Sequence, residues 1–294
     1  MTTELHLDTA VTAPRGLAVL TRGLVHVYRG EGRDVAALAG IDLTVRAGEM
    51  IALLGPSGAG KSTLLSLLAG VFRPTAGTVL IGALDLTAAT QRQLDTLHAT
   101  DVSLMLQGAG RNLLPYLTPH QNIEFAQRAA RDTDADADRL PSVPTLLGMV
   151  GLADQGDESL SRLTPGQLQL VTLAVVLSTG AGLLLADEPT SRLDHAARDQ
   201  VLAALAKVNR EFGTTVVVVT HDRDVARWMP RTVTIRDGRI GGEGRSGEEY
   251  AVVTADGFLP LLGHVRDRLP PGTLVRLEEV GDHFELRAEL EEDG

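Results

Sequence analysis

A glycine-rich segment that ends in a lysine and two hydroxyl residues carries the clearest chemistry in the sequence. Its pattern, G-x-x-x-x-G-K-[ST], is typical of a loop that grips nucleotide phosphates. Glycines let backbone N–H groups curl around an anion, and the N-terminus of a following helix adds partial positive charge. Lys61 can then reach the β- and γ-phosphates, and the Ser62 hydroxyl can bind Mg²⁺. The predicted phosphate loop comprises Gly55, Pro56, Ser57, Gly58, Ala59, Gly60, Lys61, Ser62 and Thr63.

Two adjacent carboxylates form a second candidate site. Asp187 and Glu188 follow the apolar run Leu183–Ala186 and precede Pro189 and Thr190. Two acids at the end of a strand are often only solvated surface. Their position directly after a buried run favours a catalytic role instead, because phosphoryl transfer needs charge neutralisation and a positioned nucleophile.

The segment Leu183–Thr190 (LLLADEPT) resembles the Walker B strand of ATP-binding cassette (ABC) ATPases. The resemblance implies that ATP and Mg²⁺ are the ligands, that Asp187 supports Mg²⁺ and that Glu188 polarises the attacking water. Similar matches extend from about Leu20 to Ile240 in the order of the family. Tyr28 resembles the A-loop aromatic that stacks on adenine, and Gln107 resembles the Q-loop glutamine. Ser191-Arg192-Leu193-Asp194 resembles the D-loop, with Asp194 near the nucleotide. His221 resembles the switch histidine that contacts the γ-phosphate.

The resemblance also implies partners and a fold. Gln107 would contribute to the Mg²⁺ site and to catalysis, and would link the nucleotide site to a membrane subunit. The fold would be an α/β P-loop NTPase of ABC type, with an antiparallel β subdomain and a helical subdomain at about residues 108–178. Two such ATPase subunits would sandwich the nucleotides between them.

The family's signature loop, usually Leu-Ser-Gly-Gly-Gln, reads LTPGQ at residues 163–167. Thr164, Gly166 and Gln167 would face the γ-phosphate held by the other subunit. Pro165 lacks an N–H and fixes φ, so one donor is lost and the backbone is stiffer. The basic residues that usually follow the signature are replaced by Leu170 and Val175. The chain is therefore either a slow homodimer, which we favour because Glu188 and His221 are intact, or one half of a heterodimer with unequal sites.

Within the family, residues 110–125 (GRNLLPYLTPHQNIEF) and 186–194 (ADEPTSRLD) look most like the macrolide-export and lipoprotein-release ATPases. That subgroup implies an integral-membrane permease as partner, a place on the cytoplasmic face of the cell membrane, and export or extraction from the membrane. Two other functions stay open. One is a soluble ABC ATPase, and the other is a weakly hydrolysing regulatory subunit paired with another ATPase.

The elements that must position these residues follow from the apolar runs. Short runs over residues 18–45 predict antiparallel strands. Met50–Leu54, Leu183–Ala186 and Val216–Val219 predict buried parallel strands, and Lys61–Ala69 predicts the helix behind the phosphate loop. The segment 113–160 is predicted helical with proline interruptions, and Thr232–Ile235 is predicted to be the last strand of an ATPase domain that covers residues 18–240.

Bulk properties exclude several classes of function. The 294 residues contain no cysteine, which excludes disulfides and thiolate metal sites. The net charge of -11 argues against nucleic acid as a partner. Residues 1–17 are polar and predict a flexible leader rather than a signal peptide. The longest apolar stretch, Val171–Ala186, is interrupted by Ser, Thr and Gly, so we expect no membrane span and a membrane role only through another chain.

A change of pattern marks the C-terminal end. Residues 241–249 (GGEGRSGEE) predict a linker, and residues 250–294 a small α+β module. The module would contain a β run at Tyr250–Thr254, a short helix at Leu261–Leu269, and strands at Leu274–Glu278 and His283–Leu286. It resembles the swapped hairpin of AbrB-like regulators, which would imply dimer support or regulation; a simple β appendage is the alternative.

Overall fold

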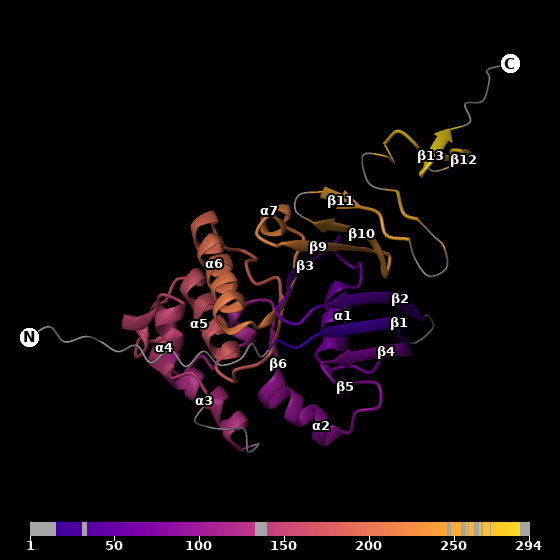
Figure 1. Ribbon diagram of the computed structural model, residues 1–294. Coiled ribbons are helices and arrows are strands. Elements are labelled where there is room, and N and C mark those ends of the chain that lie inside the picture. Colours follow the sequence, from indigo (N-terminus) through magenta and orange to yellow (C-terminus); the bar gives the residue numbers. More distant parts are fainter. Residues whose placement is uncertain are drawn as a thin grey trace, which may run out of the picture.

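We describe the fold from a computed structural model (Figure 1). The structure describes residues 16–30, 34–132, 140–245, 248–253, 257, 259–261, 265, 267–270 and 272–288. Most of the predicted leader, residues 1–15, lies outside this part of the chain. Its last residue, Leu17, donates its N–H to Gly182 O at 3.1 Å and packs against the core, so this end of the predicted leader is anchored to the domain.

A seven-stranded sheet runs through the larger part of the molecule in the order β11-β10-β9-β3-β8-β7-β6. The five consecutive strands β9, β3, β8, β7 and β6 are parallel to one another, which places their carboxyl ends at one edge of the sheet. The central strands are apolar along almost their whole length, as expected for a parallel sheet covered on both faces. The bounds are β3 Met50–Leu54, β6 Val102–Met105, β7 Leu183–Asp187, β8 Thr215–Val219, β9 Arg231–Arg236, β10 Arg239–Arg245 and β11 Glu248–Tyr250.

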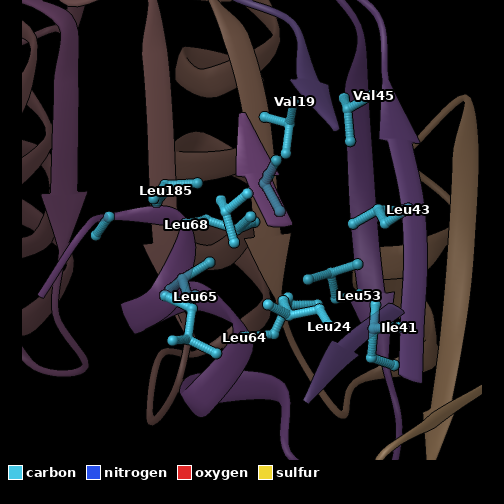
Figure 2. Close-up of a cluster of buried hydrophobic side chains, with 14 of the residues drawn as sticks. Val19, Leu24, Ile41, Leu43, Val45, Leu53, Leu64, Leu65, Leu68 and Leu185 are labelled. Carbon is cyan, nitrogen blue, oxygen red and sulfur yellow. The ribbon is translucent and has the colours of Figure 1, made fainter. Parts of the chain in front are cut away.

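Alternate residues of these strands serve two separate cores, because successive side chains of a strand point to opposite faces. Ile51 and Leu53 face the first core, which contains helix α1 (Lys61–Leu68) and the second sheet. Met50 and Ala52 face the other core, which contains the longer helices. Figure 2 shows the first core, where side chains of α1 meet those of the antiparallel strands. The helix behind the phosphate loop is thus held from both sides.

The second sheet has the order β2-β1-β4-β5 and is antiparallel, as predicted for residues 18–45. Its β1 ends at Tyr28, which carries this aromatic residue to the neighbourhood of α1. The inward-facing residues Val19, Leu24, Ile41 and Val45 are fully buried. The bounds are β1 Val19–Tyr28, β2 Val35–Val45, β4 Ala76–Ile81 and β5 Leu84–Asp85.

Helices cover the other face of the seven-stranded sheet and form a lobe on one side of it (Figure 1). Buried residues of these helices, such as Ile123, Leu146 and Val171, join the sheet residues in one core. The α/β architecture and both predicted parts, the antiparallel sheet and the helical lobe, are therefore present. The bounds are α2 Gln91–Thr96, a π-helical turn Leu97–Asp101, α3 Pro119–Asp132, α4 Val143–Met149, α5 Pro165–Leu177, α6 His195–Phe212 and α7 Arg223–Ala226.

The predicted linker at residues 241–249 is wrong, because β10 and β11 continue the main sheet through most of it. Glycine content suggested a linker, but an ion-pair cluster fixes the strand. Arg231 Nε lies 2.8 Å from Glu243 Oε1, and Arg231 Nη1 lies 3.1 Å from Glu49 Oε1. Arg245 also pairs with Glu243. The side chains of Arg231, Glu49 and Glu243 are all mostly buried, so these ion pairs hold the hairpin to the body of the domain.

The C-terminal region ends in a hairpin of β12 (Val275–Val280) and β13 (His283–Ala288), close to the two strands predicted there. The predicted β run at residues 250–254 is wrong: only Tyr250 lies in a strand, residues 251–253 are irregular, and residue 254 is not described. Of the predicted helix, the described part is one turn, in which Leu269 N–H donates to Val265 O at 2.9 Å. The AbrB-like likeness stays a prediction. Among the described residues no helix is long and apolar enough to span a bilayer.

Candidate functional site

The sequence-predicted site residues converge at the carboxyl edge of the parallel strands. The phosphate loop follows β3, the two acids end β7, His221 follows β8 and Gln107 follows β6. Because β3, β8 and β7 are adjacent in the sheet, these loops lie side by side. Ligands of open parallel sheets bind at this edge.

The phosphate loop has a backbone that requires glycine at two of its positions. Gly55 has φ of 149°, and a Cβ there would lie 2.1 Å from Ile235 O. Gly60 has φ of 98° and is the N-cap of α1, and a Cβ there would lie 2.4 Å from Ala37 O. The sequence therefore specifies an open ring of N–H groups at a helix N-terminus, which is suited to an anion.

Lys61 lies at the first position of α1 and points its ammonium group into the loop. Its Nζ donates to Gly55 O at 2.7 Å and to Pro56 O at 2.9 Å. The residue is buried although it is charged, and these two carbonyls satisfy the charge only in part. A phosphate group in the loop would supply the counter-charge that this lysine needs.

Ser62 and Asp187 form the candidate Mg²⁺ site. Ser62 Oγ donates to Asp187 Oδ1 at 3.3 Å. No cluster of three or more His, Cys, Asp or Glu residues within the described part of the chain could hold a metal. One hydroxyl and one carboxylate are nevertheless the right donors for Mg²⁺, which is usually held by few protein oxygens together with phosphate and water.

The electrostatic environment of Asp187 is set by its position at a strand end. Burial raises the pKa of this carboxyl above its ordinary value, and the neighbouring Glu188 charge raises it further. The hydrogen bond from Ser62 and the charges of Lys61 and Arg111 lower the pKa again. A cation bound here would relieve the unfavourable burial of the charged form.

Glu188 is held by two residues that follow β8. His221 Nδ1 lies 2.7 Å from Glu188 Oε1, and Thr220 Oγ1 donates to Glu188 Oε2 at 3.4 Å. The Glu188 backbone has φ of 49°, an uncommon value for a residue with a side chain, and its N–H donates to Val219 O at 2.9 Å. The carboxylate is mostly buried, whereas the histidine is mostly exposed. This is the arrangement of a carboxylate with a fixed orientation that can accept a proton from water.

Tyr28 belongs to a small aromatic cluster whose other two members the sequence analysis did not identify. The Tyr28 ring lies edge-on to His26, with ring centroids 4.8 Å apart, and to Phe72 at 6.2 Å. Its hydroxyl lies 3.1 Å from Thr63 Oγ1 of the phosphate loop. Tyr28 and Phe72 both remain partly exposed, so the cluster offers an aromatic surface beside the loop. Nothing in the pattern of residues 70–75 distinguished Phe72 from a loop residue.

Gln107 is exposed at the end of β6, and the loop that carries it is closed by Asn112. The Asn112 amide accepts from Leu106 N at 2.9 Å and donates to Leu106 O at 2.8 Å and to Gly108 O at 2.9 Å. Asn112 was not identified from the sequence, because its contacts to Leu106 and Gly108 become apparent only in the folded loop.

Comparison with known proteins agrees with this geometry. The model of the family described as "ABC transporter" matches residues 38–191. The lipoprotein-releasing system ATP-binding protein LolD 1 of Caulobacter vibrioides is 37% identical over 219 residues, which are 74% of this chain and 92% of that protein.

This chain belongs to the ABC transporter family.

Two further relatives are longer than the part that matches this ABC cassette. The methionine import ATP-binding protein MetN of Corynebacterium diphtheriae is 36% identical over 222 residues, 76% of this chain and 64% of the relative. The macrolide export ATP-binding/permease protein MacB of Rhodopirellula baltica is 35% identical over 223 residues, 76% of this chain and 32% of the relative. The match thus spans less than two thirds of the length of these two proteins.

Solved ABC cassettes share the fold. A dimeric ATP-binding cassette in a post-hydrolysis state with ADP and Pi has a TM-score of 0.68 and 29% identity, and the match covers 77% of this chain and 98% of that chain. A second dimeric bacterial ABC transporter cassette has a TM-score of 0.66 and 28% identity, with the same coverage. The chain therefore has the fold of an ABC cassette.

The signature residues of this ABC cassette form the N-terminus of α5 and are held by bonds within that helix. Thr164 is the N-cap, its Oγ1 accepts from Gln167 N at 3.2 Å, and Gln167 Oε1 accepts from Thr164 N at 2.9 Å. Pro165 lies in the first turn, where a missing N–H breaks no helix bond. A Cβ at Gly166 would lie 2.7 Å from Ala197 Cβ, so this glycine permits close packing of α5 on α6.

Not all predicted residues of the ABC site are brought together within one chain. Asp194 is the N-cap of α6 and accepts from Ala197 N at 2.8 Å. None of the described hydrogen bonds or ion pairs joins Thr164, Gly166, Gln167 or Asp194 to the phosphate loop. Their predicted contact with nucleotide would need a second subunit.

Proposed function

We propose that this chain is the ATP-binding and hydrolysing subunit of an ABC transporter. It would dimerise on ATP and drive a separate integral-membrane permease. The observation that carries the catalytic part is the contact of both Glu188 oxygens with Thr220 and His221, at the strand end next to the phosphate loop. The solved neighbours that are dimers support the dimer.

The roles of individual residues follow from their geometry. In this proposal Lys61 and the N–H groups of the phosphate loop hold the β- and γ-phosphates, and Tyr28 stacks on adenine. Ser62, Asp187 and Gln107 hold Mg²⁺, which neutralises charge on the transferred phosphoryl group. Glu188 orients the attacking water and accepts its proton, and His221 holds Glu188 and reaches the γ-phosphate.

The second subunit would complete each site. Thr164 keeps one hydroxyl proton free after it accepts the bond from Gln167, so the side chain could donate to a γ-phosphate of the partner. Gly166 packs closely against Ala197 of α6, three residues after the cap Asp194, so the signature and the D-loop lie close together. We favour a homodimer because both halves of the site, the hydrolytic residues and the signature, are present in this chain.

In this proposal the chain lies on the cytoplasmic face of the membrane, where it binds the integral-membrane permease. The relatives named for macrolide export, lipoprotein release and methionine import support membrane coupling but differ in direction. Export or extraction from the membrane therefore rests on the likeness of residues 110–125 and 186–194 alone. Pro165 favours one alternative, a weakly hydrolysing subunit that pairs with a different ATPase.

The test is affinity capture of the tagged chain from detergent-solubilised membranes of its own organism, followed by mass spectrometry and an ATPase assay. Recovery of a polytopic membrane protein together with Mg²⁺-dependent hydrolysis supports the proposal. Recovery of hydrolytic activity without any membrane protein would favour a soluble ABC ATPase. Recovery of a second, different cassette in equal amount would favour the heterodimer.

A further inference from the structure

An arginine on α6 contacts the loop that carries the switch histidine. Arg198 Nη1 lies 3.7 Å from Asp222 Oδ2 and 3.5 Å from Asp224 Oδ2, and Arg198 Nε lies 3.1 Å from Asp199 Oδ1. The Arg198 side chain is only 14% exposed, while its three partners are 40% to 48% exposed. It is thus the shielded centre of a local charge cluster.

Asp222 is bonded to the residues that hold Glu188. Its N–H donates to Thr220 Oγ1 at 3.1 Å, and the same hydroxyl donates to Glu188 Oε2 at 3.4 Å. His221, between Thr220 and Asp222 in sequence, contacts the other oxygen of Glu188. The position of Asp222 therefore determines the positions of Thr220 and His221, the two residues that contact Glu188.

The two oxygens of the Asp222 carboxylate make different contacts. Oδ1 accepts from Asp224 N at 2.8 Å and caps α7, and Oδ2 faces Arg198. Without a cation, Asp222 and Asp224 would place two negative charges in one turn, which disfavours the compact loop. A mostly shielded guanidinium between them stabilises that loop more than an exposed ion pair would.

The position of Arg198 along α6 connects this loop to the D-loop. Asp194 caps the helix, and Arg198 N–H donates to Asp194 O at 2.9 Å, so Arg198 lies one turn after the cap. The residue just before the cap region, Arg192, has φ of 63°, so the D-loop has an uncommon backbone conformation ahead of a regular helix. A movement of the D-loop would be carried by α6 directly to Arg198.

We propose that Arg198 is a positioning residue for ATP hydrolysis. It fixes the loop of Thr220, His221 and Asp222 against α6, and it thereby ties the orientation of Glu188 to the position of the D-loop. The inference rests on the proposed ATPase function. A movement of the D-loop would thus reach the Glu188 carboxylate through α6 and Arg198 of the same subunit.

The test compares Arg198→Ala with Arg227→Ala in the purified full-length chain. Arg227 also pairs with Asp224, at 3.1 Å, but its side chain is 81% exposed and it makes no ion pair with Asp222. We expect Arg198→Ala to lower kcat about tenfold with KM for ATP within about twofold, the size of effect seen for residues that act through others. Arg227→Ala should leave both constants within about twofold. An Arg198→Ala enzyme with unchanged kcat would overturn the proposal.

A double-mutant cycle distinguishes positioning from a general loss of structure. Asp222→Asn keeps the oxygen that caps α7 and removes the charge that faces Arg198. We expect Asp222→Asn to lower kcat by itself and the double variant to be no slower than Arg198→Ala, because one interaction is removed in both. Additive losses, or loss of kcat and ATP binding together in both single variants, would overturn the proposal. A wild-type chain without ATPase activity would instead refute the proposed function.

Discussion

His221 Nδ1 lies 2.7 Å from Glu188 Oε1, although the two residues are 33 positions apart in the chain. The contact exists because β7 and β8 are parallel neighbours, with Asp187 paired to Val219, so that the residues after both strands emerge together. The pairing of β7 with β8 thus brings His221 to Glu188 and makes Glu188 a candidate base. The contact with His221 then restricts the orientation of the otherwise flexible Glu188 side chain.

His221→Ala should reduce kcat by about 100-fold, because Glu188 loses the contact to one oxygen and the γ-phosphate loses a donor. ATP binding should change little, since Lys61 and the phosphate loop stay intact. Steady-state ATPase kinetics and binding of a fluorescent nucleotide measure the two effects. His120→Ala is the control: it removes a half-buried histidine that pairs with Glu124 on α3. Equal losses in the two variants would contradict the assigned role.

Asp187→Asn should stabilise the nucleotide-free protein at neutral pH while it abolishes the response to Mg²⁺-ATP. The pKa of Asp187 is raised by burial, so the folded chain binds this proton more tightly than the unfolded chain does. Stability therefore falls as pH rises from the unfolded pKa through the folded pKa, and the cost persists at neutral pH. Asn removes that cost and can still accept from Ser62.

This prediction is tested by measuring the free energy of unfolding by denaturant at several pH values, with and without Mg²⁺-ATP. The stability of wild type relative to Asp187→Asn should fall as pH rises through the folded pKa of Asp187. Wild type should gain stability when Mg²⁺-ATP is added, whereas Asp187→Asn should not. Asp154→Asn, an exposed carboxylate near α4, should behave as wild type. A destabilised nucleotide-free Asp187→Asn protein would show that the carboxylate charge is favourable where it lies.

The main strands, the order of the motifs and the partition into α/β, antiparallel and helical parts could all be predicted from the sequence. Met50–Leu54 and Lys61–Leu68 are the examples, because hydrophobic runs and glycine spacing act locally. The hairpin of β10 and β11 could not be predicted, since Arg231, Glu49 and Glu243 meet only in the folded chain. For the same reason Phe72 and Arg198 were missed: each acts through a tertiary contact and belongs to no local pattern. Asn112 bonds to the nearby Leu106 and Gly108, but its residue type alone does not distinguish it within the loop.

Phe72→Ala should raise KM for ATP roughly threefold to tenfold with kcat at saturation unchanged, because aromatic pairs contribute about 0.5–1.5 kcal/mol. The mutation removes the ring that packs edge-on to Tyr28 and stacks on His26. Phe212→Ala, a comparably exposed aromatic at the end of α6, serves as the control. A lower kcat with unchanged KM would show that Phe72 supports the chemistry and not the adenine site.

Pro165→Gly should raise ATPase turnover of the assembled dimer, because it restores a backbone N–H at the α5 N-terminus and relaxes φ. The same change should lower stability by about 0.4–1 kcal/mol, since a proline in a compatible position restricts the unfolded chain. Pro144→Gly in the first turn of α4 is the matched control, with the stability loss but no change in turnover. Turnover that is unchanged or lower in Pro165→Gly would show that the proline does not limit the signature.

Glu188→Gln tests the account most directly, because Gln keeps the shape and the contact to Thr220 but cannot accept a proton. Hydrolysis by the purified chain, followed as phosphate release with Mg²⁺-ATP, should fall by at least about 100-fold. Binding of Mg²⁺-ATP, measured by calorimetry on the same preparation, should remain within about threefold of wild type, and the ATP-bound dimer should persist during gel filtration. Phosphate release at the wild-type rate by Glu188→Gln would contradict the central claim that Glu188, held by His221 and Thr220, is the hydrolytic base.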